Sequence, residues 1–196
     1  MPEDRRARVR ALVLAAAKAR AQQALTLSNA SQTPLFAPFS PSPVRVIEAV
    51  WESLDARKAP LAVLARHDLL VDLGCGDARW LVAGVQRYGC EALGVEIDGA
   101  LVERARCEVA RCALSDRIRV EQGDVMTTDI ARAKLVIVYA FAEALHGIRA
   151  HLETQLDASA AVLSIGFRIP GWQPSCSDRV DSMRWYFYEL SECRGE

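Results

Sequence analysis

A turn containing two glycines is the part of the sequence with the clearest chemical meaning. Residues 71–79 read VDLGCGDAR and join a short apolar run to a helical pattern. Gly74 and Gly76 let the backbone turn tightly and approach a ligand without a Cβ in the way. Taken alone, the motif is also compatible with a strand-to-helix turn that binds nothing. Its meaning therefore depends on the residues that follow it.

Two carboxylates follow the next two apolar runs of the chain. Glu96 stands in GVEID, twenty positions after Gly76, and Asp124 stands in EQGDV. A carboxylate at the first position can accept both hydroxyls of a ribose, and one at the second can accept the exocyclic amine of an adenine. Because the carboxyl ends of parallel strands meet at one edge of a sheet, we expect these groups in one crevice. Each could instead cap a helix, but together with the glycine turn they predict a nucleoside site.

The residues around the turn favour S-adenosylmethionine over a dinucleotide. A dinucleotide fingerprint needs a third glycine three positions after Gly76, where this chain has Arg79. Asp72 would repel a pyrophosphate, whereas it would attract the amino group of a methionine moiety. The predicted cofactor is therefore S-adenosylmethionine, bound by Asp72, Gly74, Gly76, Glu96 and Asp124.

Alternating apolar runs and helical patterns must position these residues. The expected strands are Leu69–Leu73, Ala92–Glu96, Ile118–Gln122, Leu135–Tyr139 and Ala160–Ile165, and the expected helices between them are 78–88, 99–113 and 142–155. Such alternation predicts an α/β fold of the Rossmann type, with a mostly parallel central sheet and helices on both of its faces. The aromatic run Met183–Leu190 predicts a late antiparallel strand.

The start of the chain is expected to be separate from this α/β domain. Of the 196 residues 51% are hydrophobic, which suits one domain with its own core. We expect residues 1–35 to form an Arg- and Ala-rich helix and a polar linker, and residues 36–196 to form the domain. Within it, Ser42 is expected to cap a helix over 44–57 that has Pro43 in its first turn.

Composition excludes several classes of partner. A formal net charge of −1 gives no positive field for a stable nucleic-acid complex. The six cysteines lack the spacing of a zinc site, so we expect no metal and reduced, mostly buried thiols in an intracellular protein. No apolar run approaches the roughly 20 residues of a transmembrane helix. The Arg-rich start is compatible with a transit peptide, although Glu3 and Asp4 are atypical of one, and a solvated helix is the alternative.

These motifs resemble those of the class I S-adenosylmethionine-dependent methyltransferases. From about Phe36 to Tyr188 the chain also resembles a smaller family of protein-lysine methyltransferases. That family includes archaeal broad-specificity enzymes and mitochondrial enzymes that act on the adenine nucleotide translocator or on the c-subunit of ATP synthase. The PFSPSP entry, the stretch after Tyr139 and the GWQP tail carry this narrower match. Ala78 stands where many relatives have glycine, and Ala142 stands where they have proline.

The resemblance implies further site residues. Pro41 of the Pro-rich entry is expected beside the cofactor, and Tyr139, Phe141 and Glu143 are expected at the methyl acceptor. If the acceptor is a lysine, its amine must be neutral, and burial near the two aromatic rings favours that form. The same rings can stabilise a cationic group by cation–π contact. Glu143 is expected to orient the amine or accept its proton, and Trp172 is expected at the entrance unless it is ordinary core packing.

Several alternatives stay open at this point. The expected partner is a protein with an accessible lysine, with a mitochondrial membrane protein among the candidates. The same fold can methylate a small molecule or RNA, although the chain lacks the Asn-Pro-Pro-Tyr motif of amino-base methylation. The changes at Ala78 and in 139–143 also allow a catalytically silent module that only binds the nucleoside. The Arg-rich start and the mitochondrial relatives favour a mitochondrial over a cytoplasmic location.

Overall fold

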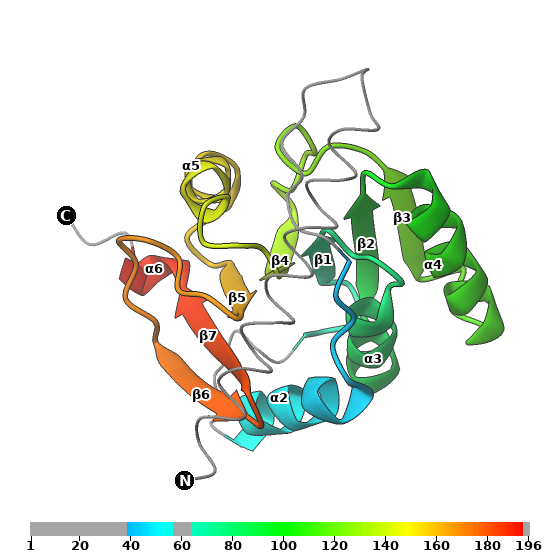
Figure 1. Cartoon of the computed structure of the whole chain (residues 1–196), viewed down its shortest axis with the longest axis horizontal. Coiled ribbons are helices and arrows are strands. Elements are labelled where there is room, and N and C mark those ends of the chain that lie inside the picture. Colours follow the sequence, from blue (N-terminus) through cyan, green and yellow to red (C-terminus); the bar gives the residue numbers. More distant parts are fainter. Residues whose placement is uncertain (1–38, 57–63, 194–196) are drawn as a thin grey trace, which may run out of the picture. The chain divides into compact units, whose positions relative to one another are not determined.

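The computed structural model describes residues 39–56 and 64–193, and its contacts divide the chain between Ser40 and Pro41 into two units. The larger unit alternates strands and helices along the chain (Figure 1). Its strands are β1 Leu69–Leu73, β2 Glu91–Glu96, β3 Ile118–Gln122, β4 Ala133–Val138, β5 Ala161–Ile165, β6 Cys176–Val180 and β7 Met183–Glu189. Its helices are α2 Val44–Ala56, α3 Arg79–Tyr88, α4 Gly99–Arg111, α5 Leu145–Gln155 and α6 Leu190–Cys193. The helix and linker expected over 1–35 lie outside the described residues.

The described strands form one seven-stranded sheet in the order β3-β2-β1-β4-β5-β7-β6. Strands β1 to β5 are parallel, β7 runs antiparallel to β5, and β6 pairs antiparallel with β7. The Rossmann-like α/β prediction is confirmed, including the late antiparallel strand. The order reverses between β1 and β4, and open α/β sheets bind ligands at the carboxyl ends of strands at such a point. Strand β6 was not predicted, because CSDRV is polar and has no apolar alternation.

Helices α2, α3 and α4 share one apolar core with the inner face of the sheet. Trp51 of α2 lies edge-on against Trp80 and Tyr88 of α3, with ring centroids 6.1 and 5.6 Å apart. Alternate strand residues such as Leu70 and Ile137 belong to this core. Helix α5 buries Leu145, Ile148 and Leu152 outside this core, and Figure 1 shows α5 apart from α2, α3 and α4.

Several local expectations differ from the structure. The fourth strand is Ala133–Val138 rather than Leu135–Tyr139, so Tyr139 follows the strand, and α4 ends at Arg111 rather than at residue 113. The helix expected over 142–155 begins only at Leu145, as α5, and residues 142–144 form a non-helical turn before it. Ser42 does not cap α2: its hydroxyl accepts from Trp80 Nε1 at 3.1 Å, and the Pro43 carbonyl accepts from Val46 and Ile47. All six cysteines are free as expected, but only Cys75 and Cys90 are buried.

The two outer strands of the sheet carry charge. Arg106 of α4 donates to the carbonyl oxygen of Val120 on β3 at 3.3 and 3.0 Å. Arg119 and Glu121 of the same strand form an ion pair. At the opposite edge, Ser177, Asp178 and Arg179 of β6 are exposed. No helix in the described part of the chain is long and apolar enough to cross a membrane.

Candidate functional site

The glycine turn folds back onto the neighbouring strand. The N–H groups of Gly74 and Cys75 both donate to the Val95 carbonyl of β2, at 2.8 and 3.0 Å. Gly74 has φ 84° and Gly76 has φ 53°, in the left-handed region that glycine adopts without strain. The sequence therefore places glycine at two positions of the turn where the backbone requires it.

Ala78, the last residue of the turn, adopts the same left-handed conformation. It precedes α3 with φ 63° and ψ 14°, offers no side-chain cap, and is fully buried. A residue with a Cβ pays about 1–2 kcal/mol for this conformation. The glycine of many relatives would avoid that cost, so the departure at Ala78 is a point of backbone strain next to the site.

Glu96 joins the glycine turn to the end of β2. One of its oxygens accepts from the N–H of Gly76 at 3.0 Å, and the other accepts from Ile97 and Asp98 at 2.9 and 3.1 Å. Asp98, not Glu96, caps α4 by accepting from Ala100 and Leu101. The helix-cap alternative for Glu96 is therefore wrong. A carboxylate has about four acceptor directions, so three donors leave room for a hydroxyl.

Asp124 follows β3 at the same edge of the sheet. Its Oδ1 accepts from the N–H of Met126 at 2.9 Å, which fixes the turn, and the side chain is half-buried. Two large apolar side chains are exposed in the loops after β2 and β3: Ile97 at 43% and Met126 at 39%. Two carboxylates with apolar surface beside them suit a flat base that carries an amine.

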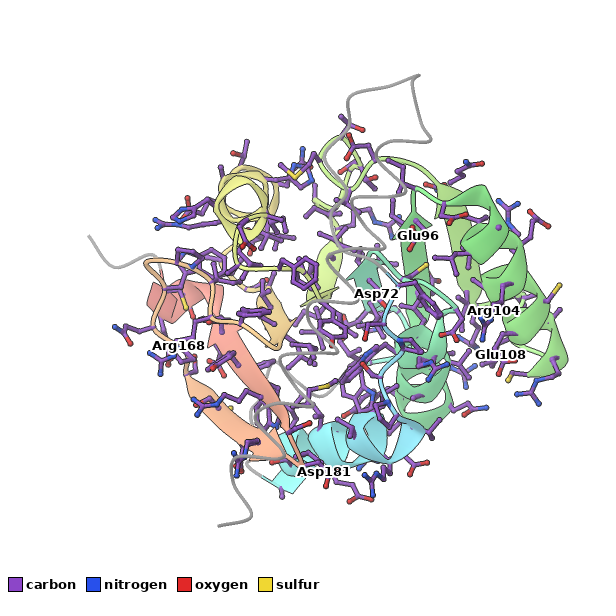
Figure 2. The ribbon with its side chains drawn as sticks, viewed as in Figure 1. Asp72, Glu96, Arg104, Glu108, Arg168 and Asp181 are labelled. Atoms are coloured by element: carbon purple, nitrogen blue, oxygen red, sulfur yellow. The ribbon has the colours of Figure 1, made fainter. Side chains whose placement is uncertain are left out.

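Asp72, at the end of β1, is a buried carboxyl without a compensating cation. It is 3% exposed, and burial, Glu96 and Asp77 together raise its pKa to about 8. Asp77 pairs with Arg79 and Arg104, and Glu96 receives backbone N–H groups, whereas no cation faces Asp72 within the described residues. Figure 2 shows Asp72 and Glu96 on the adjacent strands β1 and β2. A ligand ammonium fits this place and a phosphate does not, which suits the methionine end of S-adenosylmethionine.

The predicted acceptor residues follow β4. Val138 pairs with Leu73, the residue before Gly74, so Tyr139 begins the chain segment that runs beside the glycine turn. The half-buried ring of Tyr139 packs on Gly166 after β5, where a Cβ would lie 3.4 Å from Tyr139 Cε2. Phe141 is half-buried, and Glu143 is exposed in the turn before α5. Among described residues Glu143 has no hydrogen bond or ion pair.

Sequence reasoning missed Ser164, which shapes the turn against Tyr139. This serine is completely buried in β5, and its hydroxyl donates to the carbonyl oxygen of Phe167 at 2.7 Å. The bond closes the turn that contains Gly166. A single serine inside the apolar run AVLSI was the available signal, because a buried hydroxyl needs a partner.

Trp172 is core packing rather than part of an acceptor entrance. It is 3% exposed, and its ring lies edge-on against Tyr188 at 5.5 Å between centroids. Its Nε1 donates to Glu153 of α5 at 2.9 Å, and Arg149 of α5 donates to the Pro170 carbonyl. Of the two interpretations given for Trp172, core packing is the one that fits this burial, and the GWQP tail fixes the loop after β5 onto α5.

Pro41 is exposed and lies just before a segment that is fixed to α3. The neighbouring Ser42 accepts from Arg79 and Trp80, the first two residues of that helix. Ser42, and with it the adjacent Pro41, thus lies beside the end of the glycine turn. Contact of Pro41 with the cofactor remains a prediction.

Known proteins resemble this chain in sequence and in fold. A protein-lysine N-methyltransferase of Saccharolobus islandicus is 26% identical over 160 residues, which are 79% of this chain and 94% of that protein. A lysine N-methyltransferase of Rattus norvegicus, named for the ATP synthase c-subunit, is 24% identical over 159 residues, which are 80% of this chain and 68% of that protein.

A solved RNA methyltransferase from Salinibacter ruber, in complex with S-adenosyl-L-homocysteine, superposes with a TM-score of 0.70 and 27% identity, covering 77% of this chain and 94% of that one. The family profile described as the ANTKMT methyltransferase domain matches residues 72–176, from Asp72 of the glycine turn to the start of β6. Together with the carboxylate and glycine geometry, this match shows that the chain belongs to the ANTKMT methyltransferase domain family and is an S-adenosylmethionine-dependent methyltransferase.

Proposed function

We propose that the chain methylates the ε-amino group of a lysine in a protein. The observation that carries the proposal is the position of Tyr139, one residue beyond the Val138–Leu73 pair and packed on Gly166. This arrangement brings an aromatic, half-buried surface to the strand end next to the glycine turn. The relatives from Saccharolobus islandicus and Rattus norvegicus, both lysine methyltransferases by name, support the acceptor class.

The residues of the chain would prepare the acceptor rather than react with it. S-adenosylmethionine supplies an electrophilic methyl group, and the attacking amine must be neutral and in line with it. A lysine side chain that enters beside Tyr139 and Phe141 loses solvent, which lowers its pKa and favours the neutral amine. The aromatic rings also favour the cationic product amine. Glu143 is exposed before α5, where it would attract the incoming ammonium and orient it.

We further propose that the acceptor is a mitochondrial membrane protein and that the chain acts in mitochondria. The rat relative is named for a component of ATP synthase. At the carboxyl edge of the sheet Met126 and Phe167 are exposed at 39% and 38%. Such apolar side chains suit contact with an apolar segment around the target lysine.

Methyl transfer from labelled S-adenosylmethionine tests these proposals. Mitochondrial membranes, soluble mitochondrial proteins, total RNA and small-molecule extracts serve as separate acceptors, and Glu96→Ala serves as the cofactor-site control. Label in membrane protein, at lysine by peptide mass spectrometry, is the expected result. Label in RNA or in small molecules would contradict the protein-lysine proposal. Binding of S-adenosylhomocysteine without label in any acceptor would instead indicate a silent nucleoside-binding module.

The Tyr139→Ala variant tests the acceptor site itself. We expect turnover to fall by at least tenfold while the affinity for S-adenosylhomocysteine stays within twofold, because the ring contacts the acceptor side and not the carboxylate cluster. Tyr139→Phe keeps the ring and should retain most of the turnover. Unchanged turnover in Tyr139→Ala would remove this residue from the acceptor site.

A further inference from the structure

The guanidinium of Arg79 connects two segments that are far apart in the sequence. Its Nε and Nη2 donate to the two carboxylate oxygens of Asp77 at 2.8 and 2.5 Å, and its Nη1 donates to the carbonyl oxygen of Ser42 at 2.6 Å. Asp77 belongs to the glycine turn, whereas Ser42 belongs to the Pro-rich entry that leads into α2. In Figure 1 residues 41–43 of this entry, drawn in blue, lead into α2.

The geometry of this link makes it rigid. A two-pronged pair with a carboxylate fixes the plane of an arginine, so the remaining Nη1 can point in few directions. The side chain of Asp77 is 8% exposed and that of Arg79 is 27% exposed, so water competes weakly for these bonds. The hydrogen bond to Asp77 and the charges of Asp77 and Glu108 raise the pKa of Arg79, so the guanidinium stays charged. Figure 2 shows Glu108 and Arg104 on the neighbouring α4.

A second bond holds the same residue of the entry. Trp80 Nε1 donates to the hydroxyl of Ser42 at 3.1 Å, and that hydroxyl does not cap α2. Two consecutive residues at the start of α3 therefore hold both the main chain and the side chain of Ser42. The prolines on either side lack an N–H group and have a fixed φ, so the entry has few other ways to be positioned.

We propose that Arg79 is a positioning residue for cofactor binding: it fixes the Pro41–Ser42 segment beside the glycine turn as one wall of the cofactor site. The residue stands where a dinucleotide fingerprint has its third glycine, and here its side chain contacts Asp77 and Ser42 instead. This inference rests on the chain binding S-adenosylmethionine, but not on the identity of the methyl acceptor.

Arg79→Met tests the inference, and Arg87→Met is its matched control. Arg87 lies eight residues further along the same helix, and its Nε and Nη2 both contact a carboxylate oxygen of Asp55 in α2, at 2.7 and 2.5 Å. Its loss weakens the link between α2 and α3 without touching Ser42. The dissociation constant for S-adenosylhomocysteine is measured by calorimetry and the melting temperature by circular dichroism, for both variants and the unaltered protein.

We expect Arg79→Met to weaken binding at least tenfold and Arg87→Met to change it less than twofold. Arg79→Lys keeps the charge but cannot span both partners, so its affinity should lie between those of Arg79→Met and the unaltered protein; it also replaces Arg79→Met if that variant does not fold. Equal affinity of the unaltered protein and the Arg79 variants would overturn the proposal. Equal weakening in the Arg79 and Arg87 variants would also overturn it, because the effect would then be general loss of stability. A folded, unaltered protein that binds no S-adenosylhomocysteine would contradict the methyltransferase function itself.

Discussion

Cofactor binding should depend on pH through Asp72. In the free protein, burial and the nearby Glu96 and Asp77 raise the pKa of Asp72 to about 8. Near pH 6 to 7 most molecules therefore hold this carboxyl in its neutral form. The ammonium of the cofactor favours the ionised form, so binding must release a proton from Asp72.

The magnitude follows from the ionised fraction. Below the pKa this fraction rises about tenfold for each pH unit, which corresponds to about 1.4 kcal/mol. The ammonium stays protonated in the same range, since α-amino groups titrate near 7.7 to 8.0. Between pH 6 and pH 7 the dissociation constant for S-adenosylhomocysteine should therefore fall by close to tenfold. Nearly one proton should be released for each molecule bound.

Calorimetry in two buffers of different ionisation enthalpy measures both quantities. Asp72→Asn is the companion variant: it should bind weakly, with an affinity that does not change from pH 6 to pH 7. If the unaltered protein shows the same affinity at both pH values and releases no proton, the reasoning about Asp72 is refuted.

Asp72 should also make the stability of the cofactor-free protein depend on pH: stability should fall as pH rises, whereas cofactor affinity should increase. Folding raises the pKa of Asp72 from 3.8 to about 8, so between these two pH values the folded state binds more protons than the unfolded state. The free energy of unfolding should then fall as pH rises through this window, and from pH 4 to pH 7 the contribution amounts to about 4 kcal/mol at most. Without cofactor at pH 7, Asp72→Asn should accordingly be more stable than the unaltered protein in urea.

Three further substitutions give separate checks. Ala78→Gly should raise the free energy of unfolding, measured in urea, by about 1 kcal/mol, because glycine adopts φ 63° without the strain that a Cβ causes. A loss of stability would show that the turn is not strained. Trp172→Phe should lower the free energy of unfolding by about 1 kcal/mol, because it removes one hydrogen bond to Glu153, which is partly exposed and keeps its ion pair with Arg149. Affinity for S-adenosylhomocysteine should stay the same, and lost affinity would place Trp172 in the cofactor site. Gly166→Ala should lower turnover, because a residue with a Cβ is strained at φ 88° and the turn on which the ring of Tyr139 packs would shift. Unchanged turnover would show that the acceptor site does not depend on this turn.

The strands and the glycine turn could be predicted from the sequence because their signals are local. Leu69–Leu73 and Ile118–Gln122 have the predicted bounds, and the left-handed glycines stand where the motif places them. The roles of Asp72, Glu96 and Asp124 also rest on local motifs, since each residue lies at or just after the end of a strand of a parallel sheet. Their contact with cofactor remains a prediction.

The rest could not be predicted because it depends on partners distant in the chain. Ser42 looked like a helix cap, but residues 37 and 38 positions later hold it instead. Trp172 was predicted at the entrance because the residues next to it in the sequence give no sign that its indole donates to Glu153 of α5. Strand β6 forms through pairing with β7 alone, and its polar sequence gives no sign of it.

The charged outer strands have a consequence for how copies of the chain meet. An uncovered strand offers free backbone groups on which another copy could extend the sheet, which is a common route to aggregation. At β3 this approach is disfavoured, because Arg106 already donates to the Val120 carbonyl oxygen and Arg119 and Glu121 place charges along the edge. The exposed Asp178 and Arg179 of β6 resist the same approach at the other edge. Any assembly of this enzyme with itself should therefore use helices or loops, and the sheet should remain seven strands wide.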